Sequence, residues 1–320
     1  MNESASPRLK FLPISVFATV MGMTGLTIAW EKAQVLHGFS GVAGVLLAVT
    51  ALLFVVLLLA YGSKLVLFRA EVLKELHHPV RLSFFPTISI SLVLLSIAAL
   101  EVNHGLSEIL WLVGSALHLL FTLYVLSAWI NHEHFQIQHM NPAWFIPVVG
   151  NILVPIAGVA HGYVEVSWFF FSIGLLFWLV LLTIVFYRII FHAPLPGKLV
   201  PTLFILIAPP AVGFIAYVKL TGGVDVFARL LYYSGLFITL LLFTQVHRFA
   251  RLKFFLSWWA YSFPLAAITI ATFVLHQQLG HSPLLWLGRV LLAVLTLLLA
   301  LLLMRTAVAV KRGEICVAED

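Results

Sequence analysis

The chain is poor in charged side chains. Of its 320 residues only 12 are Asp or Glu and 18 are Lys or Arg, so that charged residues make up 9% of the total. Soluble globular domains contain about 25% charged residues. Because 62% of the residues are hydrophobic and the mean hydropathy is +1.09, the composition excludes soluble domains and disordered chains and indicates an integral membrane protein.

Cysteine is also scarce. The single cysteine, Cys316, cannot form an internal bridge, which excludes a disulfide-stabilised scaffold. The net charge of +6 could suggest a nucleic-acid partner, but such a domain needs Lys and Arg clustered on a water-facing surface. The orientation of a membrane protein explains the excess of basic residues instead, so we expect no nucleic-acid partner.

Long apolar runs fill most of the chain. A helix needs about 20 residues to cross a bilayer, and we expect residues 1–320 to form one transmembrane domain with short tails at about 1–10 and 305–320. The first run is too long for a signal peptide and lacks a cleavage pattern, so we expect it to be retained. Ten transmembrane helices are predicted, at Phe11–Trp30, Gly41–Leu65, Val80–Leu100, Leu106–Ile130, Pro142–Tyr163, Val166–Phe191, Leu199–Leu220, Val224–Val246, Phe255–His276 and Pro283–Met304.

Basic residues are distributed unevenly between the two sides of these helices. If the N-terminus is cytoplasmic, 14 of the 18 Lys and Arg residues lie on the cytoplasmic side. This bias predicts that both termini are cytoplasmic. Arg229 and Arg289 lie one to two turns into even helices, where snorkelling to the interface explains them. The four basic residues on the outer side are Lys32, Lys219, Arg229 and Arg289.

Proline within the predicted helices occurs only in the odd-numbered ones. Proline removes a backbone hydrogen bond and kinks a helix, and the freed carbonyls are tolerated where they are buried in protein or line a cavity. We therefore predict an all-α fold of five helical hairpins, with kinked odd helices lining a central pore and even helices outside. The prolines concerned are Pro13, Pro86, Pro147, Pro155, Pro209, Pro210 and Pro264.

Four segments resemble a known family. In order along the chain they are HPVRLSFFP (78–86), NPAWFIPVVGN (141–151), PTLFILIAPPAV (201–212) and WWAYSFPLAAITIA (258–271). Together they are similar to the tellurite-resistance/dicarboxylate transporter family, which includes the bacterial TehA proteins and the slow-type anion channels of plant guard cells. The resemblance extends from the first predicted helix to the tenth.

The resemblance implies how the chain assembles and which side chain closes its pore. It implies ten helices in five hairpins, and a homotrimer with a separate pore in each subunit. In the family a phenylalanine of the ninth helix blocks the pore, and Phe263 matches it. Phe84, in the third helix, is the best candidate for a second ring near Phe263.

The odd helices also supply small or weakly polar residues that would hold an ion weakly, as conduction requires. The predicted lining consists of Ser15, Thr19, Gly22, Ser83, Thr87, Gly150, Asn151, Ala208 and Ala266, with the kink residues Pro86, Pro147, Pro209, Pro210 and Pro264. The positive ends of the odd helices point to the cytoplasm. Basic residues that also set the topology lie on the same side, and we expect them to concentrate anions at the cytoplasmic mouth of the pore. They are Arg69, Lys74, Arg81, Lys198, Arg248 and Lys253.

Groups for proton coupling, catalysis or metal binding are not expected. The 12 acidic residues map to loops, tails or span ends, whereas a coupled carrier usually holds a carboxylate or histidine inside the bundle. The deepest ionisable residue is His118, for which a hydrogen-bonded or snorkelling histidine on an outer helix is favoured. No catalytic motif is present, so we expect neither an enzyme nor a cofactor. A loop lacks the helical spacing of metal ligands, so no metal site is predicted at His132, Glu133, His134 and His139.

Together with the family resemblance, these features predict an anion channel or channel-like uniporter in a bacterial inner membrane. It would pass small monovalent anions such as chloride or nitrate down their gradient. The alternative is a coupled or facilitated exporter of tellurite, sulfite or a C4-dicarboxylate. The wider membership of the family keeps this alternative open. The missing mid-membrane carboxylate argues against proton coupling but not against facilitated diffusion.

Overall fold

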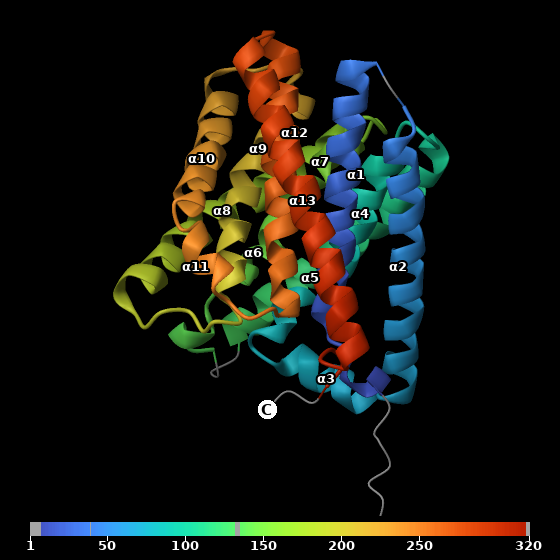
Figure 1. The fold of residues 1–320 in the computed structure, drawn as a ribbon, viewed down its shortest axis with the longest axis vertical. Helices are drawn as coiled ribbons and strands as arrows, with labels where there is room; N and C mark the ends of the chain where they lie inside the picture. Colours follow the sequence, from blue (N-terminus) through green and yellow to red (C-terminus); the bar gives the residue numbers. More distant parts are fainter. Residues whose placement is uncertain (1–7, 39, 132–134, 318–320) are drawn as a thin grey trace, which may run out of the picture.

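The computed structural model describes residues 8–38, 40–131 and 135–317, and within these ranges the regular structure is entirely helical. Figure 1 shows long helices running side by side, with α3 crossing one end. The α-helices are α1 (Ala18–His37), α2 (Val42–Leu67), α3 (Arg69–His77), α4 (Thr87–Ala99), α5 (His104–Asn131), α6 (Phe145–Val149), α7 (Pro155–Gly158), α8 (Val164–Phe191), α9 (Ala208–Thr221), α10 (Val226–Phe243), α11 (Val246–Ala250), α12 (Ser262–Leu279) and α13 (Ser282–Arg312). The 3₁₀ helices are η1 (Arg8–Phe11), η2 (Ile14–Phe17), η3 (Arg81–Phe84), η4 (Ile137–His139), η5 (Pro142–Trp144), η6 (Gly150–Leu153), η7 (Val200–Ile207) and η8 (Leu256–Tyr261).

Nine helical segments of the described chain are long and apolar enough to cross a membrane. They coincide with nine of the ten predicted spans, which confirms an all-helical membrane protein. The remaining prediction, Pro142–Tyr163, corresponds to a shorter apolar stretch, Pro142–Gly158. This stretch is divided into η5, α6, η6 and α7. It contains Pro147 and Pro155, each of which lacks the backbone donor that a continuous helix needs.

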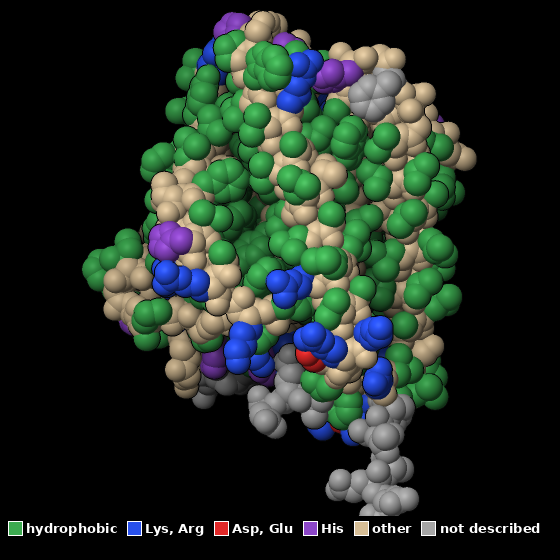
Figure 2. Space-filling view, in the orientation of Figure 1, with side chains coloured by type: hydrophobic (Ala, Val, Ile, Leu, Met, Phe, Trp, Pro, Cys, Tyr) green, Lys and Arg blue, Asp and Glu red, His purple; other side chains and the backbone are tan. Residues whose placement is uncertain are grey.

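Burial alternates along the chain. Between 78% and 83% of the central stretch is buried in Ile14–His37, Arg81–Ala99, Val200–Thr221 and Leu256–Leu279, against 11–39% in the five other long segments. The exposed helices present large apolar side chains, as Figure 2 shows for one face, where a hydrophobic band separates two ends that carry Lys and Arg. A surface of this kind is stable in contact with lipid.

The buried segments contact one another in a closed ring. Helix α1 packs against α4 and α12, α12 packs against α9, and η6 and α7 join α9 to α4. Each exposed helix packs against the buried segment that precedes it: α2 on α1, α5 on α4, α8 on α6 and α7, α10 on α9, and α13 on α12 (Figure 1). We call the ring members the inner segments and their partners the outer helices.

The inner segments begin in 3₁₀ form. Helices η2, η3, η5, η7 and η8 lead directly, or after one turn, into α1, α4, α6, α9 and α12. Pro209 and Pro264 lie in the first turn of their α-helices, and Pro86 is an N-cap residue. These prolines therefore mark junctions between 3₁₀ and α-helix, where a missing N–H costs least, rather than kinks in the middle of a continuous α-helix.

Two glycines bring α1 and α12 into close contact. A Cβ atom built on Gly22 would lie 2.7 Å from Cβ of Ser262, and one on Gly25 would lie 2.7 Å from Cβ of Ala266. Real Cβ atoms do not approach this closely, so only glycine fits at these positions. Gly22 and Ala266 were both predicted to line a pore, but in the structure they lie at the contact between α1 and α12.

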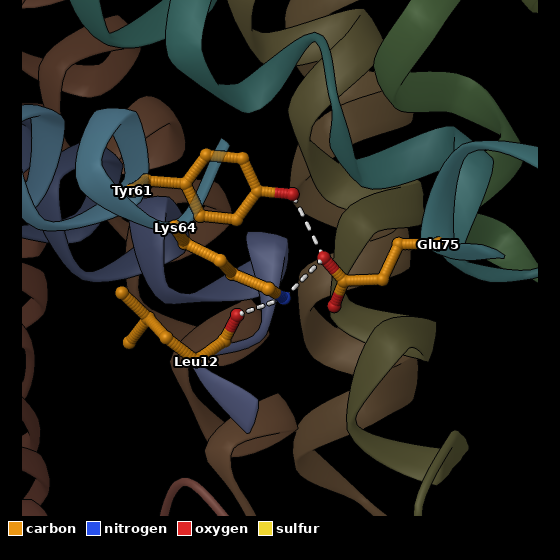
Figure 3. A network of polar contacts seen from close by, with 4 residues as sticks. All are labelled: Leu12, Tyr61, Lys64 and Glu75. Carbon is orange, nitrogen blue, oxygen red and sulfur yellow. Dashed lines mark hydrogen bonds and ion pairs between the residues drawn. The ribbon is translucent and has the colours of Figure 1, made fainter. Parts of the chain in front are cut away.

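A buried ion pair holds together the end of the molecule at which α3 lies, called the lower end. Lys64 of α2 is only 1% exposed, and its Nζ lies 2.8 Å from Oε2 of Glu75 in α3. The same ammonium group donates to the carbonyl of Leu12 at 2.8 Å, and the Tyr61 hydroxyl donates to Oε2 of Glu75 at 2.8 Å (Figure 3). The network ties α2 and α3 to the N-terminal segment.

Both described ends of the chain lie at this lower end. A Cβ built on Gly313, just after α13, would be 3.2 Å from Nη2 of Arg8. Helix α13 continues to Arg312 and η1 starts at Arg8, so part of each predicted tail, 1–10 and 305–320, is helical. The opposite end of the molecule, where α1 ends and α5 begins, is called the upper end.

Candidate functional site

Two cavities lie inside the ring of inner segments. The lower cavity has a volume of about 80 Å³, and residues near the starts of the inner segments line it. Apart from Thr87, its side chains carry no hydroxyl, amide or charge, and the Thr87 hydroxyl donates to the carbonyl of Phe84. Predicted residues that line it are Phe84, Thr87, Gly150, Ala208, Pro209, Phe263 and Pro264.

The upper cavity is larger and more polar. Its volume is about 310 Å³, and it lies among the C-terminal ends of the inner segments. Charged and amide side chains border it, in contrast to the lower cavity. These are Glu31, Lys32, Glu101, Lys219, Gln277 and Gln278.

Three side chains border both cavities and separate them. They are Leu153 of η6, Val212 of α9 and Phe263 of α12. Phe263 is 9% exposed, and its Cδ2 would lie 3.4 Å from a Cβ at Gly25, so the ring occupies space that Gly25 leaves open. We call these three residues the partition. Phe84 borders only the lower cavity.

The other predicted lining residues do not border either cavity. Thr19 Oγ1 donates to the carbonyl of Val16 at 2.7 Å, and Asn151 Nδ2 donates to Thr122 Oγ1 at 2.9 Å. Their polar groups are thus used within and between helices. The residues outside both linings are Ser15, Thr19, Gly22, Ser83, Pro86, Pro147, Asn151, Pro210 and Ala266.

The basic residues predicted for the inner mouth lie outside the cavity lining as well. Lys74 Nζ is 3.1 Å from Oε1 of Glu71, and the hydrogen bond from Lys74 lowers the pKa of that carboxyl. Arg81 is partly buried, and Lys198 lies over the ring of Phe255 at 6.0 Å. Exposed members of the group are Arg69, Lys74, Lys198, Arg248 and Lys253.

The charges of the upper cavity are the feature that the sequence did not reveal. The first span was predicted to end at Trp30, but α1 continues to His37 and ends at Gly38, whose φ of 70° is left-handed. Glu31 and Lys32 therefore lie within α1, with Lys32 Nζ 3.3 Å from Oε1 of Glu31. Gly38 was the available signal, because a left-handed glycine commonly terminates a helix.

The histidines and arginines singled out in the sequence lie in different surroundings. His118 is fully buried in α5, and its Nδ1 lies 2.9 Å from Oγ of Ser89, so it is a hydrogen-bonded rather than a snorkelling histidine. His139 Nδ1 accepts from the backbone N–H of Gln136. His132, Glu133 and His134 lie outside the described residues. Arg229 is exposed, whereas Arg289 Nε donates to Nε2 of His37 at 2.8 Å and so joins α13 to α1.

A ring of buried apolar segments that encloses two cavities, surrounded by helices with apolar outer faces, defines a multi-pass membrane protein. The SLAC1 family, described as voltage-dependent anion channel, matches residues 12–307, and the chain belongs to this family. The resemblance noted in the four sequence segments is thereby confirmed.

Individual relatives have the following similarities. The chain is 31% identical to the S-type anion channel SLAH2 of Arabidopsis thaliana over 85% of this chain, and the match spans only 54% of that protein. It is 29% identical to an uncharacterized transporter of Methanocaldococcus jannaschii over 95% of both chains. It is 28% identical to a tellurite resistance protein TehA homolog of Haemophilus influenzae over 80% of this chain and 79% of that protein.

Proposed function

We propose that the protein is an anion channel or channel-like uniporter for small monovalent anions such as chloride and nitrate. In this proposal the chain crosses the membrane ten times as five hairpins, the inner segments line a pore, and the pore runs through the two cavities. The observation that carries it is the partition: among the described residues, only Phe263, Leu153 and Val212 line both cavities. The plant relatives named as anion channels support the choice of ion.

The proposed mechanism is a hydrophobic gate. An anion that leaves water for an apolar constriction loses hydration without gaining hydrogen bonds, which is costly. The apolar lower cavity and the Phe263 ring would impose this cost, so that the closed pore conducts poorly. Exposed basic residues lie at the lower end (Figure 2), so that positive potential attracts anions to that mouth. At the upper cavity Lys32 and Lys219 are accompanied by Glu31 and Glu101, so the formal charges of its lining cancel.

The proposal also covers location and assembly. Nine long apolar helices and the short fifth stretch account for most of the described chain, and the lower end, with both described termini, is taken as the cytoplasmic side of a bacterial inner membrane. A homotrimer with one pore per subunit follows from the family resemblance. The partners are then the lipid bilayer, two further copies of the chain and small inorganic anions.

The alternative, an exporter of tellurite, sulfite or a C4-dicarboxylate, draws support from the relative named as a tellurite resistance protein. A proton-coupled version would need a titratable group on the path. Glu31 and Glu101 border the upper cavity, but no Asp or Glu lines the lower cavity or the partition in the described part of the chain. Uncoupled passage is therefore the better-supported proposal.

The function test uses purified protein in planar bilayers and proteoliposomes. Under a chloride gradient the reversal potential is expected to follow the anion equilibrium potential, because the basic residues at the lower end attract anions and repel cations. A pH gradient alone is expected to drive no accumulation of anion. Accumulation of tellurite, sulfite or a dicarboxylate against its own gradient, powered only by protons, would establish the coupled exporter instead.

The orientation can be tested by cysteine labelling in intact cells. In a Cys316→Ser background, single cysteines at exposed upper-end positions Glu101, Glu165 and Asp225 are expected to react with an impermeant maleimide. Cysteines at the lower-end positions Lys74, Asn131 and Arg251, which are also exposed, are expected to react only after the cells are permeabilised. The reverse pattern would place the termini outside and remove the argument for a positive cytoplasmic mouth.

A further inference from the structure

Three potential metal ligands meet at the upper end, away from both cavities. His104 and Glu108 lie one turn apart on the first turns of α5, and His161 lies in the turn between α7 and α8. One ligand atom of each residue lies within 4.8 Å of the other two. The rings of His104 and His161 meet edge to face, with centroids 4.5 Å apart. Residues four apart on a helix share one face, so both α5 side chains point toward the turn.

The hydrogen bonds around His161 fix its tautomer. The Ser107 hydroxyl has one hydrogen, which it donates to the carbonyl of Ser96 at 2.6 Å. Its 3.0 Å contact with Nε2 of His161 must therefore be a bond in which Nε2–H donates and the hydroxyl accepts. In the neutral ring the other nitrogen, Nδ1, then carries the lone pair.

That lone pair lies in an unusual environment. Nδ1 of His161 is buried and has no hydrogen-bond partner among the described residues. A neutral imidazole whose second nitrogen is held by a hydrogen bond is the form in which histidine binds metals.

The carboxylate is oriented by its own supporting contacts. The Tyr163 hydroxyl donates to Oε1 of Glu108 at 2.8 Å. The Tyr163 ring stacks on Trp111 with centroids 4.9 Å apart, and Trp111 Nε1 donates to the carbonyl of Val154 at 2.8 Å. This chain of contacts fixes the carboxylate beside the two imidazoles, as outer partners do in metal sites.

We propose that His104, Glu108 and His161 bind a divalent transition-metal ion, with Zn²⁺ the best match and water in the fourth position. Two imidazoles and one carboxylate suit zinc, whereas calcium and magnesium prefer oxygen ligands throughout. Tetrahedral zinc with bonds of about 2.0–2.1 Å places its ligand atoms about 3.3 Å apart. The three ligand atoms, all within 4.8 Å of one another, must therefore close by at most about 1.5 Å. Rotation of the exposed His104 side chain and small rotations of the other two can provide this.

The bound ion would connect the start of α5 to the turn between α7 and α8. The sequence predicts no metal site here, because His161 lies 57 residues beyond His104 and the three residues do not form a local spacing typical of metal ligands. The contact depends on α5 packing against α7. The inference does not rest on the proposed transport activity.

The test is a zinc titration of the full chain, purified without a histidine tag and stripped with chelator, by isothermal calorimetry. One Zn²⁺ per chain is expected, with affinity lowered about a hundredfold or more in His161→Ala and in His104→Ala, because each removes a direct ligand. Ser107→Ala leaves all three ligands in place and is expected to weaken binding about 10- to 100-fold through the lost tautomer bond. His281→Ala, which removes another exposed histidine near the upper end, is the control and should bind zinc normally.

Thermal unfolding separates binding from misfolding. With excess chelator, the variants should unfold at temperatures close to that of the parent, which shows that they are folded. Added Zn²⁺ should raise the unfolding temperature of the parent and of His281→Ala but not of His161→Ala, because a ligand stabilises only a fold that binds it. Zinc affinity that is unchanged in His161→Ala and His104→Ala, or absent from the parent, would overturn the proposal.

Discussion

Phe263→Ala is expected to raise anion conductance about tenfold or more, which corresponds to a barrier lowered by at least about 1.4 kcal/mol. The ring is the largest of the three side chains that border both cavities. Its removal would join the cavities and admit water, so that an anion keeps more of its hydration while it passes. Single-channel recording in symmetrical chloride measures the change, and cation permeability should remain negligible because no negative charge is added.

Two other phenylalanines serve as comparisons for Phe263. Phe84 borders only the lower cavity, so Phe84→Ala is expected to raise conductance less. Phe273 lies on the same helix as Phe263 but packs against Gly288 of α13, and Phe273→Ala should leave conductance unchanged. A folded Phe263→Ala protein that conducts no better than the parent, while another inner aromatic change opens the pore, would show that the gate lies elsewhere.

Glu75→Ala is expected to reduce the free energy of unfolding by about 3–5 kcal/mol, the usual cost of removing one partner from a buried ion pair. Lys64 would keep its bond to the carbonyl of Leu12 but lose its carboxylate in a site where it is 1% exposed. The Tyr61 hydroxyl would lose its acceptor as well. Denaturant titration in detergent, followed by tryptophan fluorescence, measures the loss.

Two further variants distinguish the effect of an unpaired buried charge from the effect of a missing side chain. Apolar residues of similar size in place of both partners, as in Lys64→Met with Glu75→Leu, are expected to recover most of the stability, because no unpaired charge is then buried. Lys74→Ala breaks the exposed pair with Glu71 and should change stability little, since solvent screens such pairs. A Glu75→Ala protein as stable as Lys74→Ala would mean that water reaches Lys64 in solution.

The inner and outer helices were predictable from proline. Proline is tolerated in a membrane where neighbouring protein satisfies the freed backbone groups, and the segments that contain Pro86, Pro209 and Pro264 are indeed the buried ones. The place of each proline within its segment was not predictable, because hydropathy does not distinguish 3₁₀ from α-helix. The short helices of the fifth stretch were hidden for the same reason.

The cavity lining was predictable only in part. We predicted lining residues from their small size or weak polarity. This criterion gave both Thr87, which borders the lower cavity, and Thr19, which does not. Most residues of the inner segments are buried, so composition cannot indicate which face of a segment points to the centre. Leu153 and Val212 were not predicted because they are ordinary apolar residues, and only the fold places them beside both cavities together with Phe263. The cluster around His161 was missed because its members come together only through tertiary packing.

The glycine contacts between α1 and α12 limit the ways in which the proposed passage can widen. Gly22 and Gly25 meet Ser262 and Ala266 on either side of Phe263, so separating the two backbones would empty two close-packed contacts at once, and dense packing resists such a change. Turning one aromatic side chain between staggered rotamers requires no backbone displacement. If Phe263 is the gate, we therefore expect the conducting form to differ from the closed one by a χ angle of Phe263, while α1 and α12 keep their positions.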